Sequence, residues 1–527
     1  MLRFVKKGVA LLLLSALLLS SCSAPIPEST QTGTEPGKSL ESVTETKAAE
    51  EEKGYTAALD ESTAALVATL TPLMTEKLSA KALAELPVAS SEMSSEELRR
   101  LCLDYFTLQL SFQWTPSADV KDYPSTHYDF KEPKTLDLGT VYRGIPYQSM
   151  GVGNLYRFLE YYDEEKGVFD ITTAFRENGG NHKTDIETDA AGNETYYKWR
   201  SMMIFFNQCS VASFWGWGRV INSASFAWTA DMNICNGFIP VGGFTYGYEY
   251  EGKYYGPESI DRFGKKTEGN PKKYDTKNVI FDIKVAKGVN GLYQCYAQLQ
   301  PADCLVSAGH TMMAKSVRLV YKEDGSVDYP ACEVTVLEQI EGWGEISAMG
   351  SVPYITQGGI DRVYTFKKLQ DSGYLPFTFA EFLEKDDPRL QGYSSSILSS
   401  YSVFRDRVSE KTGVGVEKAE AYCTLSSGGR VKLSDFQNMT VGSNYSISDT
   451  FVTVKNSEGK TLFQKVHRSH LARIREVAMT ARHASWDSKD TVSKGLEAYT
   501  DKGYTVSVSL QLSTGEKITA FEGILVK

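Results

Sequence analysis

The stretch from Asn207 to Ile221 constrains the fold of this chain more than any other stretch. It follows an apolar run, passes through one polar step at Gln208 and Cys209, and continues with small and aromatic residues at helical spacing. This pattern predicts a buried helix with Cys209 in its first turn. Because unpaired N–H groups and the positive dipole end favour an anion there, a thiol at that position deprotonates more readily. Cys209 is therefore a candidate nucleophile, and a buried structural cysteine is the alternative interpretation.

A second stretch, residues 301–339, supplies a possible partner for Cys209. It predicts a short apolar strand, a tight Ser-Ala-Gly turn, and a second strand that begins at His310. An Asp-Gly pair at residues 324–325 then indicates a hairpin, and the chain returns over residues 331–339. The return strand brings Glu338 or Gln339 back near His310, where a polar side chain could orient the imidazole. Strand register alone decides between these two residues, since a slip of one exchanges their faces.

These motifs resemble the NlpC/P60 and CHAP branches of the papain-like cysteine peptidases. The resemblance rests on Gln208-Cys209 at a helix start, on the run PADCLVSAGHTMM, and on the later DGS and VTVLEQ segments. It implies a papain-like domain in which Cys209 is the nucleophile, His310 the base and Glu338 the orienting residue. We expect neither a metal nor a cofactor.

The resemblance extends to the surroundings of the nucleophile. The segment 144–147 is similar to the Gly-x-Pro-Tyr element of these families, which implies that Tyr147 contacts the substrate or helps to bind the oxyanion. The backbone N–H of Cys209 is the natural first oxyanion donor. Gln208, Gln339 and Trp215 are further candidates for contact with the substrate or oxyanion.

The N-terminus predicts export and lipid attachment. Basic residues precede a short apolar run that ends in Leu19-Ser20-Ser21-Cys22, which resembles a bacterial lipobox. We therefore expect cleavage before Cys22, lipidation of that residue, and a protein held on the extracytoplasmic side of the membrane. Residues 23–54 have almost no aromatic side chains and predict a disordered tether.

The remaining chain is expected to be α+β and to contain several parts. Residues 55–114 predict N-terminal helices, with a capping box at Ser94 and Glu97. Residues 115–388 correspond to the papain-like domain. Residues 391–527 show short alternating strands with turn signals between them, which predict a separate all-β, sandwich-like domain.

Composition and localisation narrow the function. A formal net charge of -10 argues against nucleic acid as a partner, and no His, Cys or acidic cluster has metal-ligand spacing. The leading hypothesis is a membrane-anchored cysteine hydrolase that cleaves amide bonds in peptidoglycan stem peptides. Two alternatives stay open: a catalytically inactive cell-surface binding lipoprotein, and a papain-like hydrolase or acyltransferase that acts on another substrate.

Overall fold

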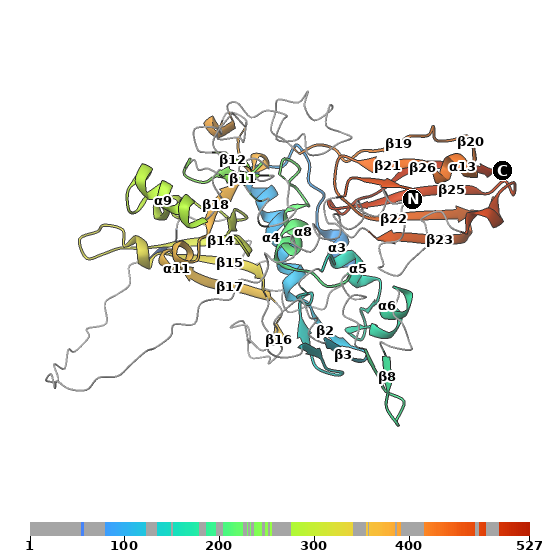
Figure 1. Cartoon of the computed structure of the whole chain (residues 1–527), viewed down its shortest axis with the longest axis horizontal. Helices are drawn as coiled ribbons and strands as arrows, with labels where there is room; N and C mark the ends of the chain where they lie inside the picture. The colour runs from blue at the N-terminus through green and yellow to red at the C-terminus, as the bar shows by residue number, and fades with distance from the viewer. Residues whose placement is uncertain are drawn as a thin grey trace, which may run out of the picture.

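The computed structural model describes most of the chain from residue 80 onward (Figure 1). The described ranges are 80–122, 134–148, 151–178, 186–196, 204–224, 237–244, 276–340, 358–384, 387–390, 416–468, 474–480 and 495–527, with shorter pieces at 54–56, 229, 232, 248–250, 253–255 and 355–356. The predicted signal peptide, the predicted lipidation site Cys22 and nearly all of the predicted tether lie outside these residues. The fold mixes helices with several separate sheets, which is compatible with the α+β class.

The N-terminal helices are α3 (Ala80–Glu85) and α4 (Ser95–Ser111). The predicted capping box is confirmed: the Ser94 hydroxyl accepts from the Glu97 N–H, and the Glu97 carboxylate accepts from the Ser94 N–H at 2.7 Å. Twelve of the seventeen residues of α4 are buried, because the helix packs against α8 and against strands of the main sheet. Helix α4 is thus a core element and not a peripheral cover.

The main sheet carries the predicted hairpin. Its path is β10-β18-β13-β14-β15-β17, every pairing is antiparallel, and β1 pairs with β14. Gly325 adopts a left-handed conformation (φ 81°) in the predicted turn, which glycine adopts without strain. The strands are β1 (Gly54–Thr56), β10 (Ile239–Pro240), β13 (Cys304–Val306), β14 (Thr311–Val320), β15 (Glu333–Gln339), β17 (Gly358–Thr365) and β18 (Leu375–Thr378).

Helix α8 (Cys209–Trp217) packs between α4 and the strands β14 and β15. All nine of its residues are buried, and the Trp217 indole N–H donates to the Ala302 carbonyl at 2.7 Å. Gly216 lets the helix approach its neighbours closely, since a Cβ there would lie 3.1 Å from the Met313 side chain and 3.2 Å from Phe106. The other helices around this sheet are α9 (Thr276–Lys287), α10 (Gly291–Tyr296), α11 (Phe366–Asp371) and the 3-10 turns η4 (Tyr329–Ala331), η5 (Ala380–Phe382) and η6 (Pro388–Leu390).

Smaller sheets follow α4 in the chain. An aromatic cluster around Trp114, Phe158 and Phe169 joins the first of them to the core. The segment 186–196 contains two short paired strands. The elements are β2 (Gln113–Pro116), β3 (Asp119–Asp122), β4 (Lys134–Leu136), β5 (Tyr142–Arg143), α5 (Leu155–Leu159), β6 (Tyr162–Asp163), β7 (Val168–Phe169), α6 (Ile171–Glu177), β8 (Ile186–Thr188), β9 (Glu194–Tyr196), β11 (Tyr248–Tyr250), β12 (Lys253–Tyr255) and β16 (Ile355–Thr356).

The C-terminal part has its own hydrophobic core, enclosed by a five-stranded sheet (β20-β26-β25-β22-β23) and a three-stranded sheet (β19-β21-β24). Predicted turns at residues 456–459 and 513–515 contain Gly459 and Gly515 in left-handed conformations. The elements are β19 (Ala421–Cys423), β20 (Arg430–Lys432), α13 (Leu433–Gln437), β21 (Thr440–Ser443), β22 (Ile447–Lys455), β23 (Thr461–Arg468), β24 (Glu476–Ala478), η8 (Leu496–Tyr499), β25 (Thr505–Leu512) and β26 (Lys517–Val526).

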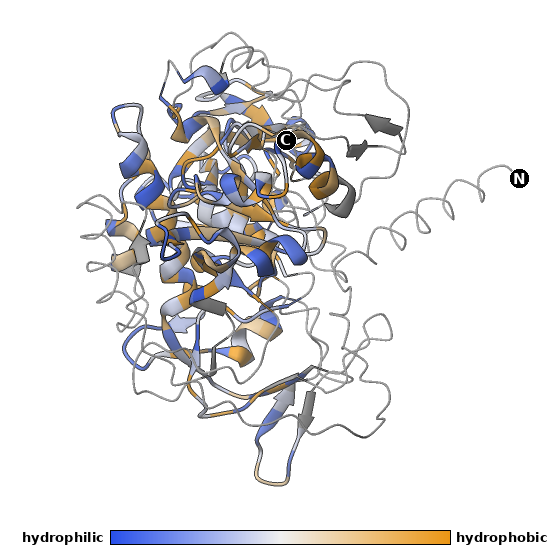
Figure 2. Ribbon diagram, turned by 90° about the vertical axis from the view of Figure 1, so that its left-hand side faces the viewer, coloured by the Kyte–Doolittle hydropathy of each residue, from blue (hydrophilic) through white to orange (hydrophobic). Residues whose placement is uncertain are grey.

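A buried ionic cluster joins the C-terminal sheets to helix α5. Arg157 is fully buried; its Nε lies 3.1 Å from Asp449 and one NH2 group donates to the Ser448 carbonyl at 2.6 Å. Arg468 pairs with Glu160 and lies 3.7 Å from Asp449. We call Arg157, Glu160, Asp449 and Arg468 the seam cluster. Figure 2 shows hydrophobic residues along the strands and helices in the middle of the molecule, with hydrophilic residues on outlying turns.

Candidate active site

Cys209 is the first residue of α8, as the sequence pattern predicts. Gln208 is the N-cap, and its side chain makes no capping hydrogen bond. The thiol-bearing residue is 4 % exposed. Because the first N–H groups of a helix have no partner within the helix, the start of α8 offers donors to a developing negative charge.

The backbone before Cys209 is clamped between two parts of an earlier segment. Asn207 forms isolated bridges with Tyr147 on one side and Val152 on the other, and its carbonyl accepts from the Gln148 N–H at 2.8 Å. Gly151 and Gly153 make this contact possible, since Cβ atoms there would lie 2.3 Å and 2.0 Å from backbone oxygens of residues 206 and 205. Tyr147 is half-buried, and its bridge to Asn207 places it beside this segment, although it lies sixty-two positions before Cys209 in the chain.

His310 and Glu338 meet at one edge of the main sheet. His310 directly precedes β14, and Glu338 lies near the end of the antiparallel strand β15. The imidazole Nε2 is 2.7 Å from Glu338 Oε2, and the Cys209 side chain is close enough to the ring to raise the pKa of His310. Since Nε2 contacts Glu338, Nδ1 is the ring nitrogen left for the thiol. Thiol, imidazole and carboxylate therefore form one connected set, the arrangement that nucleophilic catalysis by cysteine needs.

The electrostatics of this set favour a charged imidazole. Burial disfavours the imidazolium, but the hydrogen bonds to Cys209 and Glu338 outweigh it and raise the pKa of His310 to about 10. Burial also opposes ionisation of Glu338, yet its hydrogen bond to His310 holds the pKa of this carboxyl below its ordinary value. The Glu338 side chain, with 0 % of its area exposed, is thus an ionised group that stabilises His310 in the protonated form.

Two residues of β17, which sequence reasoning missed, hold the second oxygen of Glu338. The Tyr364 hydroxyl donates to Oε1 at 2.7 Å, and Arg362 Nε lies 3.1 Å from the same atom. The ring of Tyr374 stands nearly perpendicular to the imidazole of His310, with centroids 6.4 Å apart. Arg362 and Tyr364 are two positions apart in β17 and therefore lie on the same face of the strand. Nothing in the sequence places that face against Glu338.

A β-bulge separates the roles of Glu338 and Gln339. The pairing of β15 with β17 shifts between Val336 and Glu338, and the alternation of buried side chains ends at the same point. Gln339 is fully buried and donates to the Ile145 carbonyl at 2.7 Å, away from His310. Of the two residues that the sequence left open, Glu338 is the one that contacts the imidazole.

The remaining candidates differ in position. Gln208 is 3 % exposed and adjoins the nucleophile as the N-cap of α8. Trp215 is 1 % exposed and packs against Phe214 with ring centroids 5.0 Å apart. Trp215 therefore lies in the hydrophobic core, and its contact with a substrate stays a prediction.

The other cysteines of the described chain lack this environment. Burial raises the pKa of Cys295 to about 11, and burial also raises the pKa values of Cys102, Cys304, Cys332 and Cys423. All described cysteines are free thiols. Among them, only Cys209 combines a helix start with an imidazole whose pKa it raises.

Within the described ranges, no group of three or more His, Cys, Asp or Glu side chains is placed to hold a metal ion. No helix in that part of the chain is both long and apolar enough to cross a membrane. Comparisons with protein-family models, with curated proteins and with solved structures found no match.

Proposed function

We propose that this protein is a papain-like cysteine hydrolase that cleaves amide bonds, and that its substrates are peptidoglycan stem peptides. The observation that carries the proposal is the contact of Cys209, at the start of a helix, with His310, which in turn contacts Glu338 on the neighbouring antiparallel strand. This arrangement resembles the site of the NlpC/P60 and CHAP families. The choice of peptidoglycan follows from that resemblance and from the predicted lipid anchor at Cys22, which would hold the protein at the outer face of the membrane.

In the proposed reaction, the Cys209 thiolate attacks the carbonyl carbon of the scissile amide. The N–H of Cys209 donates to the resulting oxyanion, and Tyr147 and Gln208 are the neighbouring candidates for a second donor. The His310 imidazolium gives its proton to the amide nitrogen, the C–N bond breaks, and an acyl-enzyme thioester remains. Neutral His310 then takes a proton from water, the hydroxide attacks the thioester, and the thiolate leaves with release of the acid.

Glu338 keeps the imidazole oriented during both steps. Its contact with Nε2 fixes which ring nitrogen faces the thiol, as the third residue does in catalytic triads. Arg362 and Tyr364 in turn limit the rotation of the carboxylate. Glu338→Gln should therefore reduce turnover less than His310→Ala, because the amide can still hold the ring but does not stabilise its charge.

The test is incubation of the chain from residue 23 onward with purified muropeptides, followed by mass spectrometry of the products. We expect a new amine and a new acid terminus from the unaltered chain and none from Cys209→Ala. Cys423→Ala is the matched control, since this half-buried cysteine has no imidazole partner in any described contact. Full hydrolysis by Cys209→Ala would refute the mechanism.

The second candidate function is a surface binding protein without activity, and the low exposure of Cys209 favours it. The two candidates differ in thiol chemistry. A working nucleophile should react with iodoacetamide at pH 6 to 7 faster than the other cysteines, whereas an inactive site should not. Uncleaved muropeptides that remain bound to the chain would support the binding protein.

A further inference from the structure

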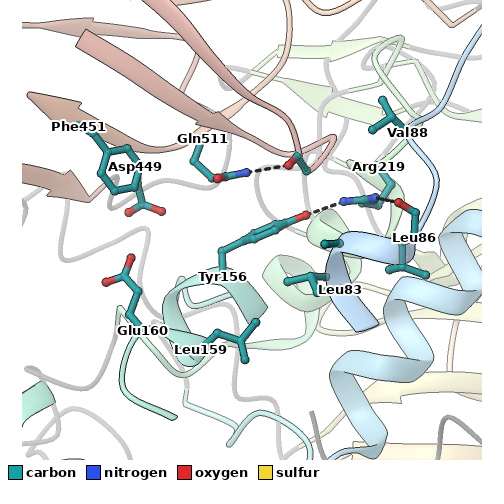
Figure 3. A pocket seen from close by; sticks show the side chains of 12 residues that line it. Leu83, Leu86, Val88, Tyr156, Leu159, Glu160, Arg219, Asp449, Phe451 and Gln511 are labelled. Atoms are coloured by element: carbon teal, nitrogen blue, oxygen red, sulfur yellow. Dashed lines mark hydrogen bonds between the residues drawn. The ribbon is translucent and has the colours of Figure 1, made fainter. Parts of the chain in front are cut away.

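A cavity of about 420 Å³ lies at the seam between the C-terminal sheets and the helices α3 and α5 (Figure 3). Its size is in the range typical of small-molecule sites, which often form where two structural units meet. The walls are largely apolar, and the polar side chains come from α5, from the residue after the C-cap of α8, and from β22 and β25. Leu83, Leu86, Val88, Leu159 and Phe451 form the apolar wall.

Arg219 contributes a buried positive charge to this cavity without an acidic partner. The residue is 2 % exposed, and none of the acidic side chains in the described part of the chain forms an ion pair with it. Its guanidinium donates only to neutral oxygens: the Tyr156 hydroxyl at 2.5 Å and the Pro87 carbonyl at 3.0 Å, with the Leu86 carbonyl at 3.5 Å. Its Nε has no hydrogen-bond partner. Burial of a cation away from water raises the free energy of the folded protein unless an anion pairs with the cation.

The acidic side chains at the other end of the cavity are already neutralised. Glu160 and Asp449 line the wall, and Figure 3 shows their carboxylates on the side away from Arg219. Arg157 and Arg468 pair with them within the seam cluster. Glu160 and Asp449 are thus paired with guanidinium groups behind the wall, and the Lys517 ammonium also lies near this end of the cavity, 3.6 Å from the centroid of the Phe451 ring. Arg219 is the charged residue of the lining for which no described acidic side chain forms an ion pair.

Tyr156 adds a donor beside Arg219. Burial raises the pKa of Tyr156, so its hydroxyl is neutral and supplies no negative charge to Arg219. The hydroxyl oxygen accepts from Arg219, and its own proton is available to an acceptor in the cavity. Guanidinium and hydroxyl together match a carboxylate, which takes two donors on its two oxygens.

We propose that this cavity binds a small monocarboxylate with an aliphatic body. The carboxylate would lie against Arg219 and Tyr156, and the body would cover Leu83 and Leu159. A doubly charged phosphate fits less well, because one cation is uncompensated and two carboxylates line the same space. This site is separate from the proposed active site, since Arg219 lies beyond the last turn of α8 and Cys209 lies in its first.

The probe is octanoate, titrated calorimetrically into the chain from residue 23 onward. Octan-1-ol and octylammonium are the matched probes, with the same body but a neutral or a positive head. We expect octanoate to bind at least tenfold more tightly than either, because a charge-assisted hydrogen bond is stronger than a neutral one. Equal affinity for octanoate and octan-1-ol would show that the cavity takes apolar bodies without regard to charge and would overturn the proposal.

Three variants locate the binding. Arg219→Met should weaken octanoate binding at least tenfold, and Tyr156→Phe about two- to tenfold, as expected for one hydrogen bond. Ala84→Trp places a large side chain on an exposed part of the wall, so it should block the site and keep the fold even if Arg219→Met does not fold. Arg176→Met removes a surface arginine, which pairs with Glu194, and is the control. Octanoate binding that survives Ala84→Trp lies elsewhere, and the proposal would then be wrong.

Discussion

The seam cluster and the candidate active site are built from the same kinds of groups, yet their chemistry differs. Each holds a carboxylate with almost no exposed area between two cationic side chains: Asp449 between Arg157 and Arg468, and Glu338 between His310 and Arg362. At the seam both cations are guanidinium groups, which stay charged at any physiological pH. At the site one cation is an imidazole that contacts a thiol.

This difference explains why similar ionic contacts can have different roles. One can hold parts of the molecule together, and another can include a group that is able to transfer a proton. A group can transfer a proton only if it exists in both protonation states during the reaction, and arginine does not. The seam cluster therefore holds two parts of the molecule together, whereas the imidazole of His310 is a group that can exchange a proton, as the proposed function requires. The following predictions test this distinction.

The largest effect is expected from Arg157→Leu at the seam. Loss of a fully buried cation leaves Asp449 with one partner in place of two, so the free energy of unfolding should fall by about 3–5 kcal/mol. Urea denaturation measures the change. Arg176→Leu is the control, because its ion pair with Glu194 is at the surface and is expected to contribute about 0–1 kcal/mol. A loss below 1 kcal/mol for Arg157→Leu would show that the seam cluster does not hold the two parts of the molecule together.

The second prediction concerns the pH dependence of the difference in unfolding free energy between the unaltered chain and His310→Gln. The pKa of His310 rises from an ordinary 6.5 to about 10, so its contribution is complete below pH 6.5 and is lost as the pH rises toward 10. The pKa of Glu338 lies below its ordinary 4.5, so the contribution of Glu338 is lost only as the pH falls below that value. The difference should therefore be greatest between about pH 4.5 and 6.5 and should amount to roughly 2–4 kcal/mol. A difference independent of pH would mean that the pKa of His310 is the same in the folded and the unfolded protein, and the raised pKa would then be wrong.

A third prediction separates the neighbours Glu338 and Gln339. Gln339→Leu leaves the Ile145 carbonyl without its donor, and stability should fall by about 1–3 kcal/mol. The rate at which iodoacetamide alkylates Cys209 should stay the same, because Gln339 does not contact His310. If alkylation slows as much in Gln339→Leu as in Glu338→Gln, the assignment of the two roles is wrong.

The smallest effect is expected from Tyr364→Phe, which removes one hydrogen bond to Glu338 and keeps the ring. Stability should fall by about 0.5–1.5 kcal/mol. The pKa of His310, followed by NMR of its ring protons, should fall, because a carboxylate that is held less firmly stabilises the imidazolium less well. An unchanged imidazole titration would reduce Tyr364 to a packing residue.

Short sequence patterns predicted those elements whose geometry is determined by residues close to one another in the chain. The capping box at Ser94 and Glu97, the helix that begins at Cys209 and the turn at Gly325 all arise within a few residues of chain. Their geometry is fixed by hydrogen bonds and dihedral preferences that the sequence carries directly.

The parts that the sequence did not predict depend on distant pairings. The choice between Glu338 and Gln339 depends on a bulge opposite β17, and Arg362 and Tyr364 reach Glu338 only through the pairing of that strand. The contact of Arg157 with Asp449 joins residues that lie 292 positions apart. No periodicity within one segment reports such contacts, because they arise from how the segments pack.

The packing of Gly151 and Gly153 against residues 205–207 limits which residues can occupy these two positions. A codon change at position 153 would place a methyl group 2.0 Å from the Phe205 oxygen, inside the segment that leads to Cys209. At Gly429, by contrast, an added methyl group meets nothing within 4 Å. In a library randomised at these codons and selected for the folded protein, position 153 should return glycine alone, whereas position 429 should return many residues. We thus expect the contact that positions Cys209 to tolerate least change where it carries no side chain at all.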